Sequence, residues 1–147
     1  MRILIADSQA KVRRALRMRL EQAGQVQVVG EAADAPNMLS RIVNTAADLV
    51  LLDGNLPGLP MTELLSVLRQ AWPRLRIIVL STRPEAGPVA LAAGADAFVS
   101  KTDPAEHLLA AIEKCRRLLE SGNRTPVQTA VLPVEARKGN NGKRSGR

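Results

Sequence analysis

The chain has very few of the residues that build disulfides and metal clusters. It contains one cysteine, Cys115, and one histidine, His107, in 147 residues. This count excludes an internal disulfide and a structural zinc site made of several cysteines and histidines. A lone cysteine is typical of a protein in a reducing compartment, so we expect a cytoplasmic location.

Aromatic residues and long apolar runs are scarce as well. Trp72 and Phe98 are the only aromatic residues, although hydrophobic residues make up 46% of the chain. Small and aliphatic side chains must therefore fill the core, as they do in buried parallel strands. No apolar run approaches the roughly 18 residues that cross a bilayer. The first residues, Met1 to Asp7, carry one positive charge and a short apolar stretch that ends in an acid, which is not the pattern of a signal peptide.

The formal net charge of +7 is concentrated near the C-terminus. Residues 121–147 hold six basic residues and one acid, a net charge of +5, which leaves +2 for the rest of the chain. This segment is also rich in Gly, Asn and Pro, a composition that favours disorder. We therefore expect one folded domain at residues 1–120 and a basic, disordered tail at 121–147. Such a tail would attract nucleic acid only nonspecifically and in a salt-sensitive way.

Short aliphatic runs alternate with segments of helical periodicity along the folded part. The runs predict strands at residues 2–6, 26–32, 49–52, 77–80 and 97–99. Between them we expect helices that end at Gly24, begin near Pro36, begin at a Thr62 cap, cover Val89 to Ala93, and run from an Asp103 cap to Glu120. Five strands alternating with five helices predict an α/β domain with a doubly wound parallel sheet.

Four chemically distinctive side chains follow the predicted strands: Asp7, Asp53, Ser81 and Lys101. In such sheets, ligands bind beyond the carboxyl ends of the strands. Two carboxylates, a hydroxyl and an ammonium at one edge suit phosphoryl transfer to a carboxylate. Asp53 would be the nucleophile and form an acyl phosphate. Asp7 and Asp53 would hold a magnesium ion, while Lys101 and Ser81 would contact the phosphoryl oxygens.

Four stretches carry a family resemblance. Residues 3–7 (ILIAD), 49–58 (LVLLDGNLPG), 77–81 (IIVLS) and 94–101 (GADAFVSK) resemble bacterial two-component response-regulator receiver domains, over about residues 2–120. Gly30-Glu31-Ala32 and residues 101–112 are most similar to receivers of the LuxR-type regulator group, although no DNA-binding output domain follows in this sequence. The resemblance implies a flavodoxin-like (βα)5 fold with strand order 2-1-3-4-5.

The resemblance also implies that the protein acts in signalling and is not an enzyme. Asp53 would accept a phosphoryl group from a histidine kinase or phosphotransfer protein in a reaction that needs Mg²⁺. Ser81 and Phe98 would form the switch, Lys101 would contact the phosphoryl group, and the main-chain carbonyl of Asn55 would join Asp7 and Asp53 as a metal ligand. A downstream protein partner and a homodimer are further implied interactions.

Three features depart from the family pattern. Ser8 stands where receivers usually have a second acid, which is their direct metal ligand, Pro60-Met61 replaces the usual Asp-Gly, and Thr102 replaces the proline that often follows the lysine. Two interpretations therefore stay open. One is a phosphorylatable receiver in which two carboxylates suffice for magnesium, since this ion commonly takes one or two carboxylates. The other is a pseudo-receiver that binds proteins without being phosphorylated.

Other interpretations have less support in the sequence. A flavin-binding flavodoxin would need a Ser/Thr/Gly-rich phosphate loop after the first strand, and residues 7–11 (DSQAK) do not provide one. Taken alone, Asp53 could be a cap or turn former, Ser81 could cap the following segment, and Lys101 could be a solvated charge. The basic first helix, with Lys11, Arg13, Arg14, Arg17 and Arg19, is typical of a solvated face.

Overall fold

The fold alternates strands and helices throughout residues 1–121, the part of the chain that the computed structural model describes. The strands are β1 (Arg2–Ala6), β2 (Gln27–Ala32), β3 (Leu49–Asp53), β4 (Arg76–Ser81) and β5 (Ala97–Ser100). The helices are α1 (Ala10–Ala23), α2 (Ala35–Thr45), α3 (Met61–Ala71), α4 (Ala86–Ala92) and α5 (Ala105–Ser121). Within this part, no helix is both long and apolar enough to span a membrane.

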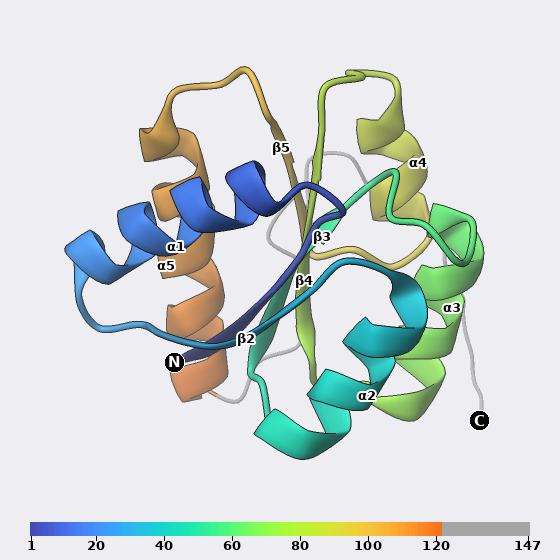
Figure 1. Ribbon diagram of the computed structural model, residues 1–147, viewed down its shortest axis with the longest axis horizontal. Helices are drawn as coiled ribbons and strands as arrows, with labels where there is room; N and C mark the ends of the chain where they lie inside the picture. The colour runs from blue at the N-terminus through green and yellow to red at the C-terminus, as the bar shows by residue number, and fades with distance from the viewer. Residues whose placement is uncertain (122–147) are drawn as a thin grey trace.

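The strands form one parallel sheet in the order β2-β1-β3-β4-β5. Helices α1 and α5 cover one face of the sheet, and α2, α3 and α4 cover the other (Figure 1). This arrangement confirms the predicted doubly wound, flavodoxin-like fold. All five strands run the same way, so their carboxyl ends meet at a single edge of the sheet.

Alternation along the buried strands divides the core into two layers. In β1, Ile3 and Ile5 pack in the layer under α1 and α5, whereas Leu4 and Ala6 pack in the layer under α2 and α3. Strands β3 and β4 are buried on both faces, so their sequences are nearly continuous aliphatic runs. Leu, Ile and Val side chains of the three central strands, β1, β3 and β4, therefore fill the core in place of aromatic residues.

The structure corrects two helix starts. The predicted Thr62 cap is wrong, because α3 begins at Met61 and Pro60 occupies the N-cap position without a side-chain hydrogen bond. Helix α4 spans Ala86–Ala92 and so begins before the predicted Val89. Pro88 lies in the first turn of this helix, where proline is tolerated because its missing N–H has no helical partner.

Helix α5 also differs from its prediction at both ends. It begins at Ala105, and the Asp103 carboxylate lies 3.2 Å from Nδ1 of His107. It extends through Ser121, one residue into the predicted tail. The rest of that tail, residues 122–147, lies outside the described residues.

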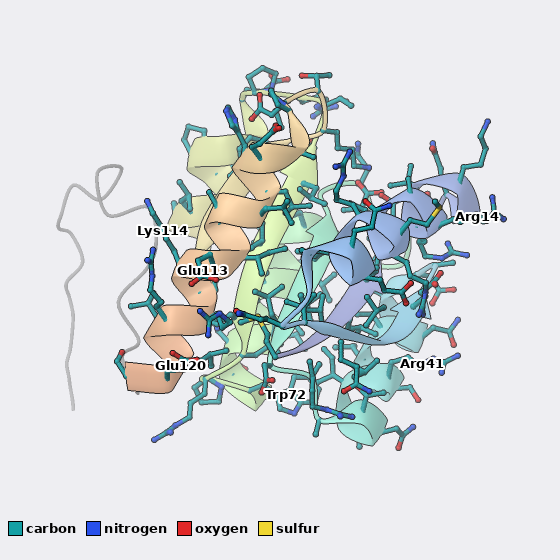
Figure 2. The ribbon with its side chains drawn as sticks, turned by 90° about the vertical axis from the view of Figure 1, so that its left-hand side faces the viewer. Arg14, Arg41, Trp72, Glu113, Lys114 and Glu120 are labelled. Atoms are coloured by element: carbon teal, nitrogen blue, oxygen red, sulfur yellow. The ribbon has the colours of Figure 1, made fainter. Side chains whose placement is uncertain are left out.

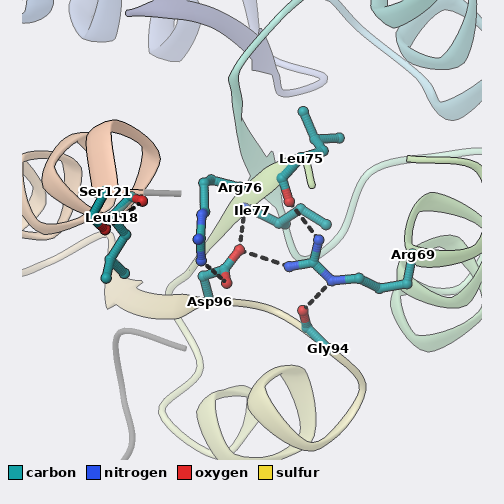
Figure 3. Close-up of polar contacts among 8 residues, drawn as sticks. All are labelled: Arg69, Leu75, Arg76, Ile77, Gly94, Asp96, Leu118 and Ser121. Atoms are coloured by element: carbon teal, nitrogen blue, oxygen red, sulfur yellow. Dashed lines mark hydrogen bonds and ion pairs between the residues drawn. The ribbon is translucent and has the colours of Figure 1, made fainter. Parts of the chain in front are cut away.

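A buried ionic cluster joins α3, β4 and β5 at the edge opposite the carboxyl ends (Figure 3). The Asp96 carboxylate accepts hydrogen bonds from Arg69 Nη2 at 2.7 Å, Arg76 Nη1 at 3.1 Å and the Ile77 main-chain N–H at 2.9 Å. Arg69 also donates to the main-chain carbonyls of Leu75 and Gly94. One carboxylate therefore organises the start of β4 and the loop that enters β5.

Cys115 is fully buried in the α1/α5 layer, and burial raises the pKa of its thiol from 9.0 to about 12. At pH 9 the unfolded chain is therefore half ionised at this thiol while the folded chain stays protonated. Stability from this group is full below pH 9 and is lost as pH rises toward 12. We expect a disulfide reagent at pH 9 to modify urea-unfolded protein rapidly and native protein far more slowly. Equal rates would contradict this burial.

Candidate functional site

The four predicted side chains meet at the carboxyl edge of the sheet. Asp7 directly follows β1, Asp53 ends β3, Ser81 ends β4, and Lys101 directly follows β5. These strands are neighbours in the sheet. The Gly54 N–H donates to the Leu80 carbonyl at 2.8 Å, which sets the segment after Asp53 beside the end of β4.

The Lys101 ammonium links the two carboxylates. Its Nζ lies 2.7 Å from Oδ2 of Asp7 and 3.2 Å from Oδ1 of Asp53. Both carboxylates are buried, whereas the lysine side chain is 22% exposed. Burial lowers the pKa of Lys101, but the hydrogen bond to Asp7 and the charges of Asp53 and Asp7 outweigh it, so the pKa lies above its usual 10.5. The ammonium is therefore a fixed positive charge at physiological pH.

Short-range hydrogen bonds orient both carboxylates. Oδ1 of Asp7 accepts the Gln9 main-chain N–H at 2.9 Å, and Oδ1 of Asp53 accepts the Asn55 N–H at 3.0 Å. In both cases the carboxylate bonds a main-chain donor two residues further on, which is the Asx-turn pattern. The same interactions hold the two side chains in the turns that follow β1 and β3.

The oxygen donors present fit a hydrated magnesium ion. Two carboxylates converge on one point, as their shared contact with Lys101 Nζ demonstrates. Among residues 1–121, no three His, Cys, Asp or Glu side chains gather into a metal-binding group. A cation held by Asp7 and Asp53 would therefore complete its shell with water, a main-chain carbonyl and ligand oxygens, which is the usual habit of Mg²⁺.

Ser81 ends β4, and Phe98 lies on the neighbouring strand β5. Ser81 is buried, and its Oγ accepts the Arg83 main-chain N–H at 3.0 Å. Phe98 is half-buried on β5 and points toward α4, where a Cβ added to Gly87 would lie 3.0 Å from Cδ2 of its ring. The phenyl ring thus rests on the one residue of that helix turn that has no side chain.

Two arginines on α1 belong to a network that the sequence did not predict. Nε of Arg13 lies 3.0 Å from Oε1 of Glu31, and its Nη1 donates to the Asp7 main-chain carbonyl at 2.6 Å. Arg17 binds the other oxygen of Glu31 at 2.8 Å. Both arginines are therefore ion-paired, and Arg13, whose side chain is 18% exposed, is not the solvated charge that helix periodicity suggested. The available signal was Glu31 itself, a charged residue within a predicted strand.

Comparisons with known proteins agree with this geometry. Residues 3–113 match the family model of the response regulator receiver domain. The chain is 34% identical over 135 residues to the uncharacterized transcriptional regulatory protein YhcZ of Bacillus subtilis, covering 90% of this chain and 60% of that protein. It is 32% identical to the nitrate/nitrite response regulator NarL of Escherichia coli, covering 88% of this chain and 62% of NarL. It thus spans about three fifths of these relatives.

Solved structures show the same relationship. A two-component response regulator of the LuxR family from Aurantimonas sp. superimposes with a TM-score of 0.73 at 30% identity, covering 86% of this chain and 89% of that one. The isolated receiver domain of RcsB from Salmonella enterica, solved with a beryllofluoride phosphomimetic, gives a TM-score of 0.70 at 27% identity, covering 90% and 98%. The chain belongs to the response regulator receiver domain family of two-component signalling systems.

Proposed function

We propose that this receiver domain accepts a phosphoryl group on Asp53 from a histidine kinase or phosphotransfer protein, with Mg²⁺ as cofactor. One observation carries the proposal: a single ammonium, Lys101 Nζ, contacts two buried carboxylates at the edge of the sheet where α/β folds bind ligands. Buried carboxylates bridged by a fixed cation are arranged to receive an anionic group whose charge must be neutralised.

The chemistry follows from the roles of the side chains. A carboxylate oxygen of Asp53 attacks the phosphorus of the donor, an O–P bond forms, and the P–N bond to the donor imidazole breaks, with the electron pair staying on nitrogen. Lys101 contacts the transferred group and offsets its charge. Magnesium, held by Asp7, Asp53 and the Asn55 carbonyl, would supply further charge neutralisation.

Ser81 and Phe98 would convert phosphorylation into a surface change. The Ser81 hydroxyl accepts a hydrogen bond from Arg83 N–H, so its own proton remains available to donate to a phosphoryl oxygen. Movement of Ser81 toward that oxygen would open space beside Phe98, whose ring faces α4. A downstream protein or a second copy of the chain would then read the altered surface. These partners and a cytoplasmic location remain predictions.

The pseudo-receiver is the second candidate, and Ser8 is the observation that favours it. Ser8 is exposed in the turn after β1 and contributes no carboxylate, so the magnesium site depends on Asp7 and Asp53. If this site is too weak, the fold would act only as a protein-binding module. Nonspecific binding of nucleic acid by the basic tail concerns residues outside the described part and stays a prediction.

One experiment distinguishes the phosphorylatable receiver from the pseudo-receiver. The 147-residue chain is incubated with acetyl phosphate, with and without Mg²⁺, and its intact mass is measured. We expect one added phosphoryl group in the presence of magnesium and none in Asp53→Ala. No modification of the wild type over a wide range of magnesium concentrations would favour the pseudo-receiver.

A further inference from the structure

We propose that Arg13 is a positioning residue of the phosphoacceptor site, which fixes the β1–α1 turn so that the Asp7 carboxylate stays directed at Lys101 and the cation position. The inference rests on the proposed function for its consequence. Its structural part concerns Arg13, Glu31 and Asp7 alone and is testable without a metal.

Arg13 holds both ends of a three-residue turn. Its main-chain N–H donates to the Gln9 carbonyl at 3.1 Å, and its guanidinium donates to the Asp7 carbonyl at 2.6 Å. The Gln9 main-chain N–H donates a hydrogen bond to the Asp7 carboxylate at 2.9 Å. Residues 7, 9 and 13 therefore form a closed set of hydrogen bonds around Ser8, and the direction of the Asp7 side chain is part of that set.

The guanidinium is held in place from its other side. Nε of Arg13 lies 3.0 Å from Oε1 of Glu31, whose second oxygen is bound by Arg17 at 2.8 Å. The Arg17 hydrogen bond and the neighbouring Arg13 lower the pKa of Glu31, so its carboxylate stays charged at neutral pH. Glu31 lies on β2 and Asp7 directly follows β1, so Arg13 ties helix α1 to two strands near the site.

The location of Arg13 is unfavourable for an ordinary surface charge. It lies in the first turns of α1, where the helix dipole disfavours a cation, and no acidic residue of the first turn compensates it. The Asp7 carbonyl and Glu31 carboxylate supply the missing compensation. A solvated role is also inconsistent with the 18% exposure of its side chain.

The absence of a second acid at position 8 makes the contacts of Arg13 with Asp7 and Glu31 important for cation binding. Because Ser8 provides no carboxylate, a cation at the β1 end of the site depends on Asp7. The affinity for the cation then depends on how firmly Asp7 is held, as with other outer partners of metal ligands, whose loss typically weakens metal binding by about 10–100-fold.

Arg13→Lys is the decisive substitution, because it keeps the positive charge and removes the two-point contact. Arg17→Lys is the matched control, since Arg17 binds the same glutamate but not Asp7. Two quantities are measured by NMR on the ¹⁵N-labelled full chain: the exchange rate of the Gln9 amide without metal, and the dissociation constant for Mg²⁺ followed through the Gly54 and Asn55 amides.

We expect Arg13→Lys to speed exchange of the Gln9 amide and to weaken Mg²⁺ binding roughly ten-fold, the lower end of the range for such partners. Arg17→Lys should leave both near the wild-type values. If the exchange rate of the Gln9 amide in Arg13→Lys equals that of the wild type, the inference is overturned, whatever the Mg²⁺ affinity. It is also overturned if Arg13→Lys and Arg17→Lys change the exchange rate equally.

The design separates this inference from the proposed function. If the wild type neither binds Mg²⁺ nor becomes phosphorylated, the proposed function fails, and the Gln9 amide alone decides the role of Arg13. If Arg13→Lys does not fold, Glu31→Gln replaces it, because this change leaves Arg13 in place but removes the charge that anchors it. Glu31→Gln should then speed exchange at Gln9, and an unchanged rate overturns the inference.

Discussion

Replacing Asp96 with alanine should lower the free energy of unfolding by about 3–5 kcal/mol, because it removes one partner of a buried ionic cluster. The Asp96 carboxylate is 3% exposed and bonds Arg69, Arg76 and the Ile77 N–H. Without it, two largely buried guanidinium groups lose their shared anion. Domains of this size have a total stability of roughly 5–15 kcal/mol, so the change removes a large part of it. Urea unfolding followed by circular dichroism measures the effect.

An exposed ion pair provides the matched control. Glu113 pairs with Arg116 at 2.6 Å on the surface of α5, and its side chain is 41% exposed (Figure 2). Water screens such pairs, so Glu113→Ala should change stability little. If Asp96→Ala destabilises the protein no more than Glu113→Ala does, then the cluster at the start of β4 does not stabilise the fold as we infer.

Replacing Lys101 with methionine should have opposite effects on metal binding and on phosphorylation. Nζ of Lys101 contacts oxygens of both Asp7 and Asp53, so its removal frees these oxygens for Mg²⁺ and should tighten magnesium binding. Phosphoryl transfer should slow by roughly 10²–10³-fold, the usual effect of losing one fixed group that stabilises transition-state charge. An NMR titration with Mg²⁺ and the rate of modification by acetyl phosphate give the two quantities.

Lys114→Met is the control for the lysine substitution. Lys114 is exposed on α5 and has no contact with the two carboxylates, so its replacement should change neither quantity. A Lys101→Met protein that is phosphorylated as fast as the wild type would exclude the proposed role of the ammonium. Trp72 is a poor reporter for these experiments, because it follows α3 at the edge of the sheet opposite Asp53 (Figure 2).

The sheet and the residues at its carboxyl edge were predictable from sequence for one physical reason. Strands buried on both faces are continuous aliphatic runs, and their ends are marked where a polar residue interrupts the run, as at Asp7, Asp53 and Ser81. Parallel connections then place those ends together without further information. Helix boundaries were less predictable, because α3 begins at Met61 after a proline N-cap and α4 begins at Ala86, and apolar spacing marks neither start.

The charged networks could not be predicted in the same way. Arg13 and Arg17 follow the periodicity of an exposed helix face, and only the approach of α1 to β2 brings them to Glu31. Asp96 is separated from Arg69 by 27 positions, so its burial depends on the packing of α3 against the loop before β5. Side chains that pair over such separations carry no local pattern.

The identity of the phosphorylated residue tests the central claim most directly. The full chain is treated with acetyl phosphate and Mg²⁺ and then with borohydride, which reduces an aspartyl phosphate to homoserine, and the peptides are mapped by mass spectrometry. We predict homoserine at position 53 and at no other aspartate. Conversion at a different residue, or none under any magnesium concentration, would contradict the assignment of Asp53 as the phosphoacceptor.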